Sequence, residues 1–133
     1  MLKKTVTYTD YNGIERTEDF YFNLSKAELM KMEVGTSGGF AEMINKVVAA
    51  QDAPAIITIF EDLVLKAYGE KSPDGKHFNK VDELGRPLSA KFAQTEAYSQ
   101  IFMELATNAN AAAEFVNRVL PAEAKTQQFI SNN

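Results

Sequence analysis

The segment 5–22 alternates polar and apolar residues on both sides of a turn signal, and this pattern predicts an antiparallel β-hairpin. The first strand, 5–9, is rich in β-branched residues, and the second runs from 14 to 22. Between them lies the sequence DYNG, a combination typical of tight turns. An isolated hairpin is marginally stable in water, so the remaining chain or a partner must cover one of its faces.

Two registers are conceivable for this hairpin. A two-residue loop at Asn12 and Gly13 would place Val6 opposite Asp19 and mix apolar with acidic side chains on one face. A three-residue loop closed by a type I turn and a G1 bulge suits Asp10 and Gly13 better. This second register, which we predict, gathers the apolar side chains on one face: Val6, Tyr8, Ile14, Phe20 and Phe22.

The rest of the chain carries helical signals, so the predicted fold class is α+β: an N-terminal β-hairpin followed by about five α-helices packed as a small bundle. Ser25 and Glu28 form a capping box that begins a short first helix. Apolar residues recur with helical spacing further along, and Thr95 has the position of a helix cap. The other predicted helices are 40–51, 55–68 as the most buried, one following Thr95, and 111–120.

The length of 133 residues suits one domain. We expect residues 1–121 to form a single α+β domain and 122–133 to form a flexible C-terminal tail.

No apolar run approaches the roughly 18 residues of a membrane span, and the N-terminus lacks the apolar region of a signal peptide. The sequence therefore predicts no membrane partner.

The stretch 68–78, YGEKSPDGKHF, has the composition of a catalytic or ligand-binding loop. A phosphate-binding loop would need a different glycine spacing and a hydroxyl residue after Lys76, where His77 stands instead. A metal site would need more partners for this single histidine, and the chain has no cysteine. We therefore predict a turn between helices, no metal or other cofactor, and no enzymatic activity.

The formal net charge of −4 gives no bulk attraction for nucleic acid, so we expect none as a partner. What remains is protein contact through aromatic side chains of the hairpin and through the irregular segment 78–94. The alternative role of these side chains is ordinary packing within the sheet and against the helices. The candidate protein-binding residues are Tyr8, Tyr11, Phe20, Tyr21, Phe22, Phe78, Leu84, Leu88 and Phe92.

Three segments carry a resemblance to a known family. They read TVTYTDYNGIERTEDFYFNLSKAELMKME, IFEDLVLKAYGEKSPDGKHF and FAQTEAYSQIFMELATNANAAAEFVNRVLP. With these segments the chain resembles the tail assembly chaperones of long-tailed bacteriophages and prophages, over roughly residues 3 to 121. The family has no active site whose residues could be carried over to this chain.

The resemblance implies a non-enzymatic protein of the host bacterial cytoplasm. Such a protein binds the phage tape measure protein and keeps it soluble during tail assembly, with the major tail protein as a second candidate partner. The hairpin's open edge could also pair with another copy, giving a homo-oligomer. The alternatives are a structural virion protein of the tail or neck, and a small phage-encoded inhibitor of a host protein.

Overall fold

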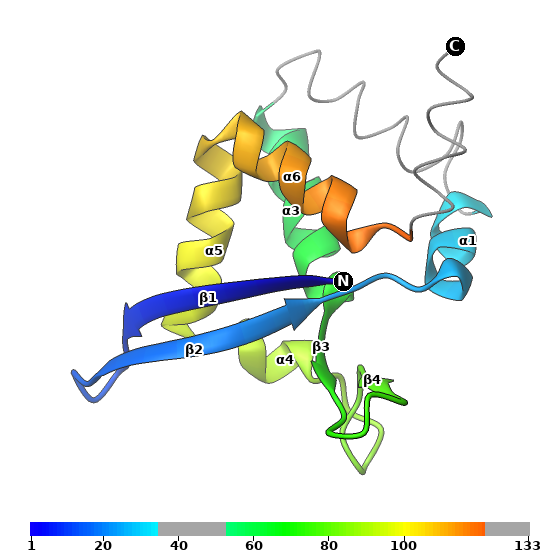
Figure 1. Ribbon diagram of the computed structural model, residues 1–133. Helices are drawn as coiled ribbons and strands as arrows, with labels where there is room; N and C mark the ends of the chain where they lie inside the picture. Colours follow the sequence, from blue (N-terminus) through cyan, green and yellow to red (C-terminus); the bar gives the residue numbers. More distant parts are fainter. Residues whose placement is uncertain (35–52, 122–133) are drawn as a thin grey trace.

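The computed structural model describes residues 1–34 and 53–121, and Figure 1 shows their arrangement. The helix predicted at 40–51 and the tail predicted at 122–133 lie outside the described residues. The described strands are β1 (Leu2–Thr9), β2 (Glu15–Phe22), β3 (Tyr68–Lys71) and β4 (Phe78–Asn79). The described helices are α1 (Lys26–Val34), α3 (Ala53–Ala67), α4 (Ser89–Phe92), α5 (Glu96–Thr107) and α6 (Ala109–Val119).

The strands form one antiparallel sheet in the order β1-β2-β3-β4. Figure 1 shows α3, α5 and α6 gathered on one side of this sheet. The hairpin side chains that point toward the helices are buried, with Leu2, Val6 and Phe22 each at most 5% exposed. The predicted α+β class, with an N-terminal hairpin and a set of helices, is confirmed.

The predicted hairpin register is confirmed. Val6 pairs with Glu18 rather than with Asp19, and the Asp10 N–H donates to the Ile14 carbonyl at 2.9 Å. The loop therefore holds three residues, and its last one, Gly13, has a φ of +79°, a left-handed conformation that favours glycine. The first strand begins at Leu2, three residues earlier than the alternating pattern indicated.

The turns of residues 10–14 and 82–86 are built alike. In each, one oxygen of an aspartate, Asp10 or Asp82, accepts two backbone N–H bonds across the turn at 2.9 Å. The other oxygen of each aspartate meets an arginine, Arg16 or Arg86. The Arg16 contact first, and then the Ile14 N–H, lower the pKa of Asp10.

The prediction that 68–78 is a turn between helices is wrong. Helix α3 ends at Ala67, and β3 follows at once, pairing Phe22 with Tyr68 and Tyr21 with Gly69. A glycine cap is not required, because the Ala67 carbonyl accepts the Asn23 N–H at 2.8 Å. Only the turn of residues 72–75 agrees with the expectation, with the Gly75 N–H bonded to the Ser72 carbonyl at 3.0 Å.

Lys80 joins three parts of the fold at the C-terminal end of α3. Its ammonium donates to the carbonyls of Asn23 and Lys66 and lies 3.0 Å from Glu28 Oε2. Burial lowers the pKa of Lys80. Glu28 also belongs to the capping box of α1: it accepts the Ser25 N–H at 2.9 Å and donates its own N–H to Ser25 Oγ at 3.1 Å, so the predicted capping box is confirmed. The lysine thus stabilises the C-terminus of α3 and the N-terminus of α1 together.

The segment 78–94, predicted to be irregular, contains β4, a bridge between Val81 and Pro87, and helix α4. Phe92 at the end of α4 is 3% exposed and stacks on Tyr68 with ring centroids 4.0 Å apart. Three further rings surround it at 5.5 to 5.8 Å: Phe20, Phe22 and Tyr98. Phe92 therefore holds this segment against β2, β3 and α5, because each of its neighbours belongs to one of those elements.

Replacing Phe92 with alanine should lower the free energy of unfolding by about 3–5 kcal/mol, because it empties the centre of the aromatic cluster. Urea unfolding followed by circular dichroism measures the change. Leu84→Ala is the matched control in the same segment, since Leu84 is 76% exposed and should change stability by less than about 0.5 kcal/mol. Equal losses in the two variants would contradict this account of the core.

The lowered pKa of Asp10 predicts that the folded protein loses stability over a defined range of acidic pH. Its contribution to stability is present above the unfolded-state pKa, about 3.9, and is lost as the pH falls through the lower folded-state pKa. Asp10→Asn should therefore show a smaller loss of stability than the wild type between about pH 5 and pH 2. Urea midpoints across this range test the idea, with Glu83→Gln in the second turn as control. An unchanged pH profile in Asp10→Asn would argue against it.

Candidate protein-binding surface

The nine candidate residues divide by burial into core and surface residues. Phe22 is fully buried and Phe92 is 3% exposed, so the structure places both in the core rather than on a contact surface. Tyr8 and Phe20 are partly buried and pack against that core from the sheet face that carries Phe22. The packing alternative therefore accounts for these four side chains.

Tyr21 and Phe78 lie on the same outer face of the sheet, in β2 and β4, with β3 between them. Tyr21 pairs with Gly69 in β3, and the ring of Phe78 lies where a Gly69 side chain would be, 2.5 Å from an ideal Cβ position. Gly69 is thus required so that the Phe78 ring can approach the backbone of β3 this closely. Both aromatic side chains are half-buried, which leaves part of each ring open to solvent.

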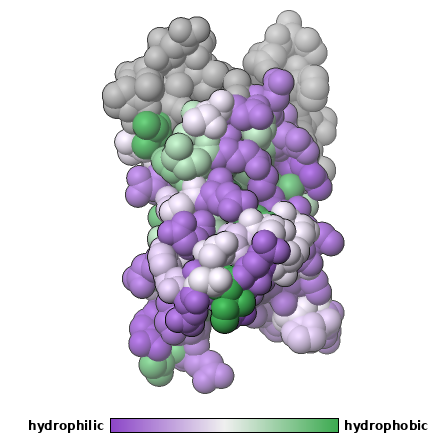
Figure 2. Space-filling model, turned by 90° about the vertical axis from the view of Figure 1, so that its left-hand side faces the viewer, coloured by the Kyte–Doolittle hydropathy of each residue, from purple (hydrophilic) through white to green (hydrophobic). Residues whose placement is uncertain are grey.

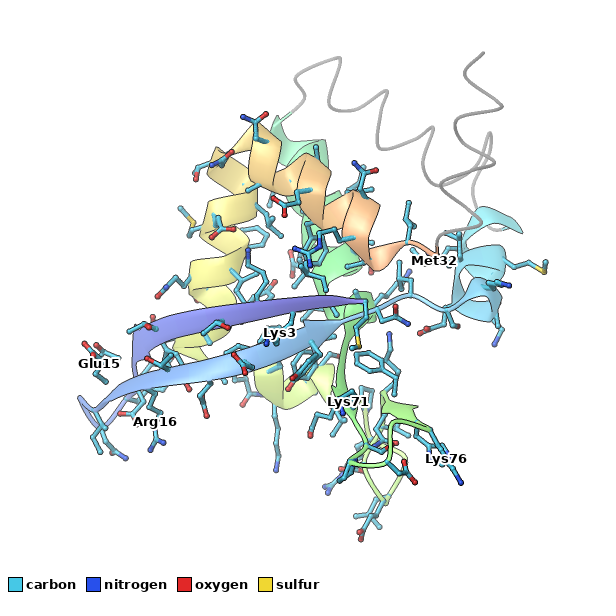
Figure 3. The ribbon with its side chains drawn as sticks, in the orientation of Figure 1. Lys3, Glu15, Arg16, Met32, Lys71 and Lys76 are labelled. Carbon is cyan, nitrogen blue, oxygen red and sulfur yellow. The ribbon has the colours of Figure 1, made fainter. Side chains whose placement is uncertain are left out.

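Lysine side chains frame this outer face. Lys3 pairs with Tyr21, Lys71 pairs with Phe78, and both lysines are exposed. Figure 3 shows Lys3 and Lys71 on the side of the sheet turned away from the helices. The outer face, defined here as Lys3, Tyr21, Lys71 and Phe78, therefore combines two aromatic rings with two positive charges. Such a surface suits a polypeptide with apolar and acidic groups.

Two candidate residues lie at the tips of the like-built turns. Tyr11 is 74% exposed and Leu84 is 76% exposed. Ile14 lies three residues after Tyr11 and Val81 lies three residues before Leu84, and both are also exposed apolar residues that the sequence analysis did not select for binding. Figure 2 shows the molecule from the left-hand side of Figure 1, where the hairpin turn lies, and the most apolar side chains in this view are isolated among hydrophilic ones. Alternation assigned Ile14 to the covered face, but the hairpin extends past the helices there. Leu88, the remaining candidate, is half-buried.

The tyrosines of the hairpin are linked to acidic residues. The Tyr8 hydroxyl donates to Glu18 across the strands, and this bond raises the pKa of Tyr8. A hydrogen bond to Glu96 likewise raises the pKa of Tyr11. Both tyrosines therefore stay protonated at neutral pH, and the exposed Tyr11 offers a neutral ring to solvent.

His77 lies exposed in the β3–β4 turn, where its backbone N–H donates to Ser72 Oγ at 3.0 Å. In residues 1–34 and 53–121 no group of three or more histidine, cysteine, aspartate or glutamate side chains could hold a metal ion. Among the helices of these same ranges, none combines the length and the apolar character needed to cross a bilayer.

In the part of the chain that the structure describes, the fold is that of a small α+β protein whose sheet has a helix layer on one face and aromatic and lysine side chains on the other. The chain matches the family described as phage tail assembly chaperone over residues 1–130, and it belongs to that family. Neither a curated protein nor a solved structure matches it. The resemblance noted in the sequence is thereby confirmed at the level of the family.

Proposed function

We propose that this protein binds the phage tape measure protein in the host bacterial cytoplasm and keeps it soluble until tail tube subunits assemble around it. Membership of the tail assembly chaperone family supports the proposal, because it implies protein partners in tail assembly. Within the fold, the observation that best supports the proposal is that Tyr21 and Phe78 on the outer face remain partly open to solvent.

Binding in this proposal requires no covalent chemistry. A client segment covers the Tyr21 and Phe78 rings and removes apolar surface from water, which gives affinity. Lys3 and Lys71 at the margin attract acidic groups and help to orient the client. The exposed turns with Tyr11 and Leu84 extend this contact beyond the sheet, so the protein covers a longer stretch of client. The major tail protein is a second client on the same reasoning.

Co-expression with the tape measure protein tests the proposal directly. The wild-type chain should raise the soluble fraction of the client, and Tyr21→Thr should reduce that gain about fivefold or more, since an interfacial tyrosine contributes over about 1 kcal/mol. Met103→Gln is the matched control, because it removes an apolar side chain that is 55% exposed on α5. Equal client solubility with and without the chain would refute the proposed function.

The proposed role also predicts the composition of finished particles. A chaperone leaves before the tail is complete, so mass spectrometry of purified virions should find the tape measure protein but not this chain. Stoichiometric amounts of the chain in the particles would instead support the alternative of a structural tail or neck protein.

A further inference from the structure

The sheet ends at β1, and the next position along it is vacant in the described parts of the chain. Asp10 and Ile14 form a hydrogen-bonded pair, and such pairs alternate along antiparallel strands. Even-numbered residues of β1 therefore bond to β2. The N–H and C=O groups of Lys3, Thr5 and Thr7 point the other way, toward the vacant edge.

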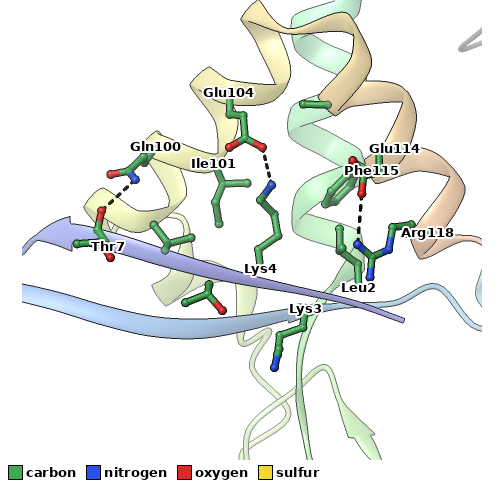
Figure 4. Close-up of a pocket in the computed structure, with 13 residues that line it drawn as sticks. Leu2, Lys3, Lys4, Thr7, Gln100, Ile101, Glu104, Glu114, Phe115 and Arg118 are labelled. Atoms are coloured by element: carbon green, nitrogen blue, oxygen red, sulfur yellow. Dashed lines mark hydrogen bonds and ion pairs between the residues drawn. The ribbon is translucent and has the colours of Figure 1, made fainter.

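A recess of about 360 Å³ lies along this edge. One wall is β1 from Leu2 to Thr7, and the other is formed by α5 and α6. Figure 1 shows both helices continuing past β1 on the side away from β2, and Figure 4 shows their side chains facing the strand. The helix layer thus reaches beyond the last strand, and the recess between them is where one more strand would lie.

The accessible walls of the recess are polar. Lys4 pairs with Glu104 at 2.5 Å, and Arg118 pairs with Glu114 at 3.3 Å (Figure 4). The apolar residues beneath them, Ile101 and Phe115, are each only 1% exposed. An occupant would therefore be held chiefly by main-chain hydrogen bonds and by polar side chains, rather than by burial of apolar surface.

The free edge of β1 already accepts a hydrogen bond from a side-chain amide, a group that resembles a backbone peptide group. The side-chain amide of Gln100 donates to the Thr7 carbonyl at 3.0 Å, as the N–H of a neighbouring strand would. Gln100 is exposed, so its amide can move away when a strand arrives. The carbonyl is thus oriented for a strand partner while a replaceable group satisfies it.

A second copy of this chain does not fit the recess. Pairing two β1 edges about a twofold axis is antiparallel and places both helix layers on the same face of the joined sheet. Adjacent strands are only about 4.8 Å apart, and each helix layer already overhangs its own β1. The two layers would occupy the same space, so the occupant must be a strand without its own helix layer.

We propose that the recess receives an extended, polar segment of the client, which adds as a fifth strand beside β1 and bonds to Lys3, Thr5 and Thr7. This is β-strand addition, with the α5–α6 wall selecting polar side chains at alternate positions of the segment. The proposal rests on the proposed function, because the client is its tape measure protein, and it specifies the conformation of the bound segment.

Amide hydrogen exchange at single-residue resolution distinguishes this geometry. In the complex with the tape measure protein, the N–H groups of Lys3, Thr5 and Thr7 should exchange at least about tenfold more slowly than in the free chain. Lys4 and Val6 already bond to β2 and should change little. Slowing that alternates along β1 is the signature of an added strand.

Two proline variants form a matched pair. Thr7 and Thr17 lie opposite each other with their hydroxyls 2.9 Å apart, so Thr7→Pro and Thr17→Pro remove the same side-chain bond. Both N–H groups point away from the partner strand, a position where an edge tolerates proline. Only Thr7 faces the recess, so Thr7→Pro should lower recovery of the complex about tenfold while Thr17→Pro leaves it near wild type.

The outcomes separate this inference from the function on which it rests. A soluble complex with unchanged exchange at Thr5 and Thr7 would overturn the added strand but leave the chaperone function standing. Slow exchange at these residues in the free chain would also overturn it, because another part of the chain or a second copy would then cover the edge. A client that stays insoluble would refute the function and the inference together. The Thr7→Pro result counts only when the variant is folded. The exchange measurement uses the wild-type chain and does not depend on this variant.

Discussion

The fold depends on how the connection between β2 and α1 satisfies the C-terminal carbonyls of two helices. The Asn23 N–H bonds to Ala67 at the end of α3, and the Leu24 N–H bonds to Val119 at the end of α6, at 2.8 and 3.0 Å. The last carbonyls of a helix have no partner within it, and buried ones are costly to leave unpaired. Two consecutive backbone groups therefore fix the hairpin to both helices, and Lys80 adds a third bond through the Lys66 carbonyl.

This junction determines which surfaces remain for binding. Because the helices are fixed at the Phe22 end of the hairpin, they cover one sheet face there, and within residues 1–34 and 53–121 no helix of this layer lies on the opposite face. The other end of the hairpin, with Tyr11 and Ile14, extends into solvent. The same placement leaves the β1 edge beside α5 and α6 without a strand partner in the described residues. The outer face and the β1 edge thus both follow from one packing arrangement.

The sequence predicted what depends on local signals. The hairpin register follows from alternation and from the turn at Asp10 and Gly13, and Thr95 caps α5 as expected by accepting the Tyr98 N–H at 3.1 Å. Asn108, the residue before α6 begins, caps that helix in the same way by accepting the Ala111 N–H. Such signals act over a few residues, so they can be recognised without knowledge of the tertiary structure.

Long-range pairings were not predictable in the same way. Strands β3 and β4 are short, and Tyr68 belongs to a sheet only because Phe22 lies beside it in space. Phe92 looked like part of an irregular loop because its helix has only four residues. Among the candidate residues, aromatic character alone could not separate the buried Phe22 from the neighbouring half-buried Tyr21. Alternation predicted the sheet face of each residue, but it did not predict how far the helices cover that face.

The central claim is that the outer face of the sheet contacts a polypeptide client. Photo-crosslinking in cells that co-express the tape measure protein tests it most directly, with a benzophenone amino acid in place of Tyr21 or of Ile57, which is 43% exposed on α3. The account predicts strong crosslinks to the client from position 21 and few from position 57. Crosslinks of equal strength from both positions, or from position 57 alone, would contradict it.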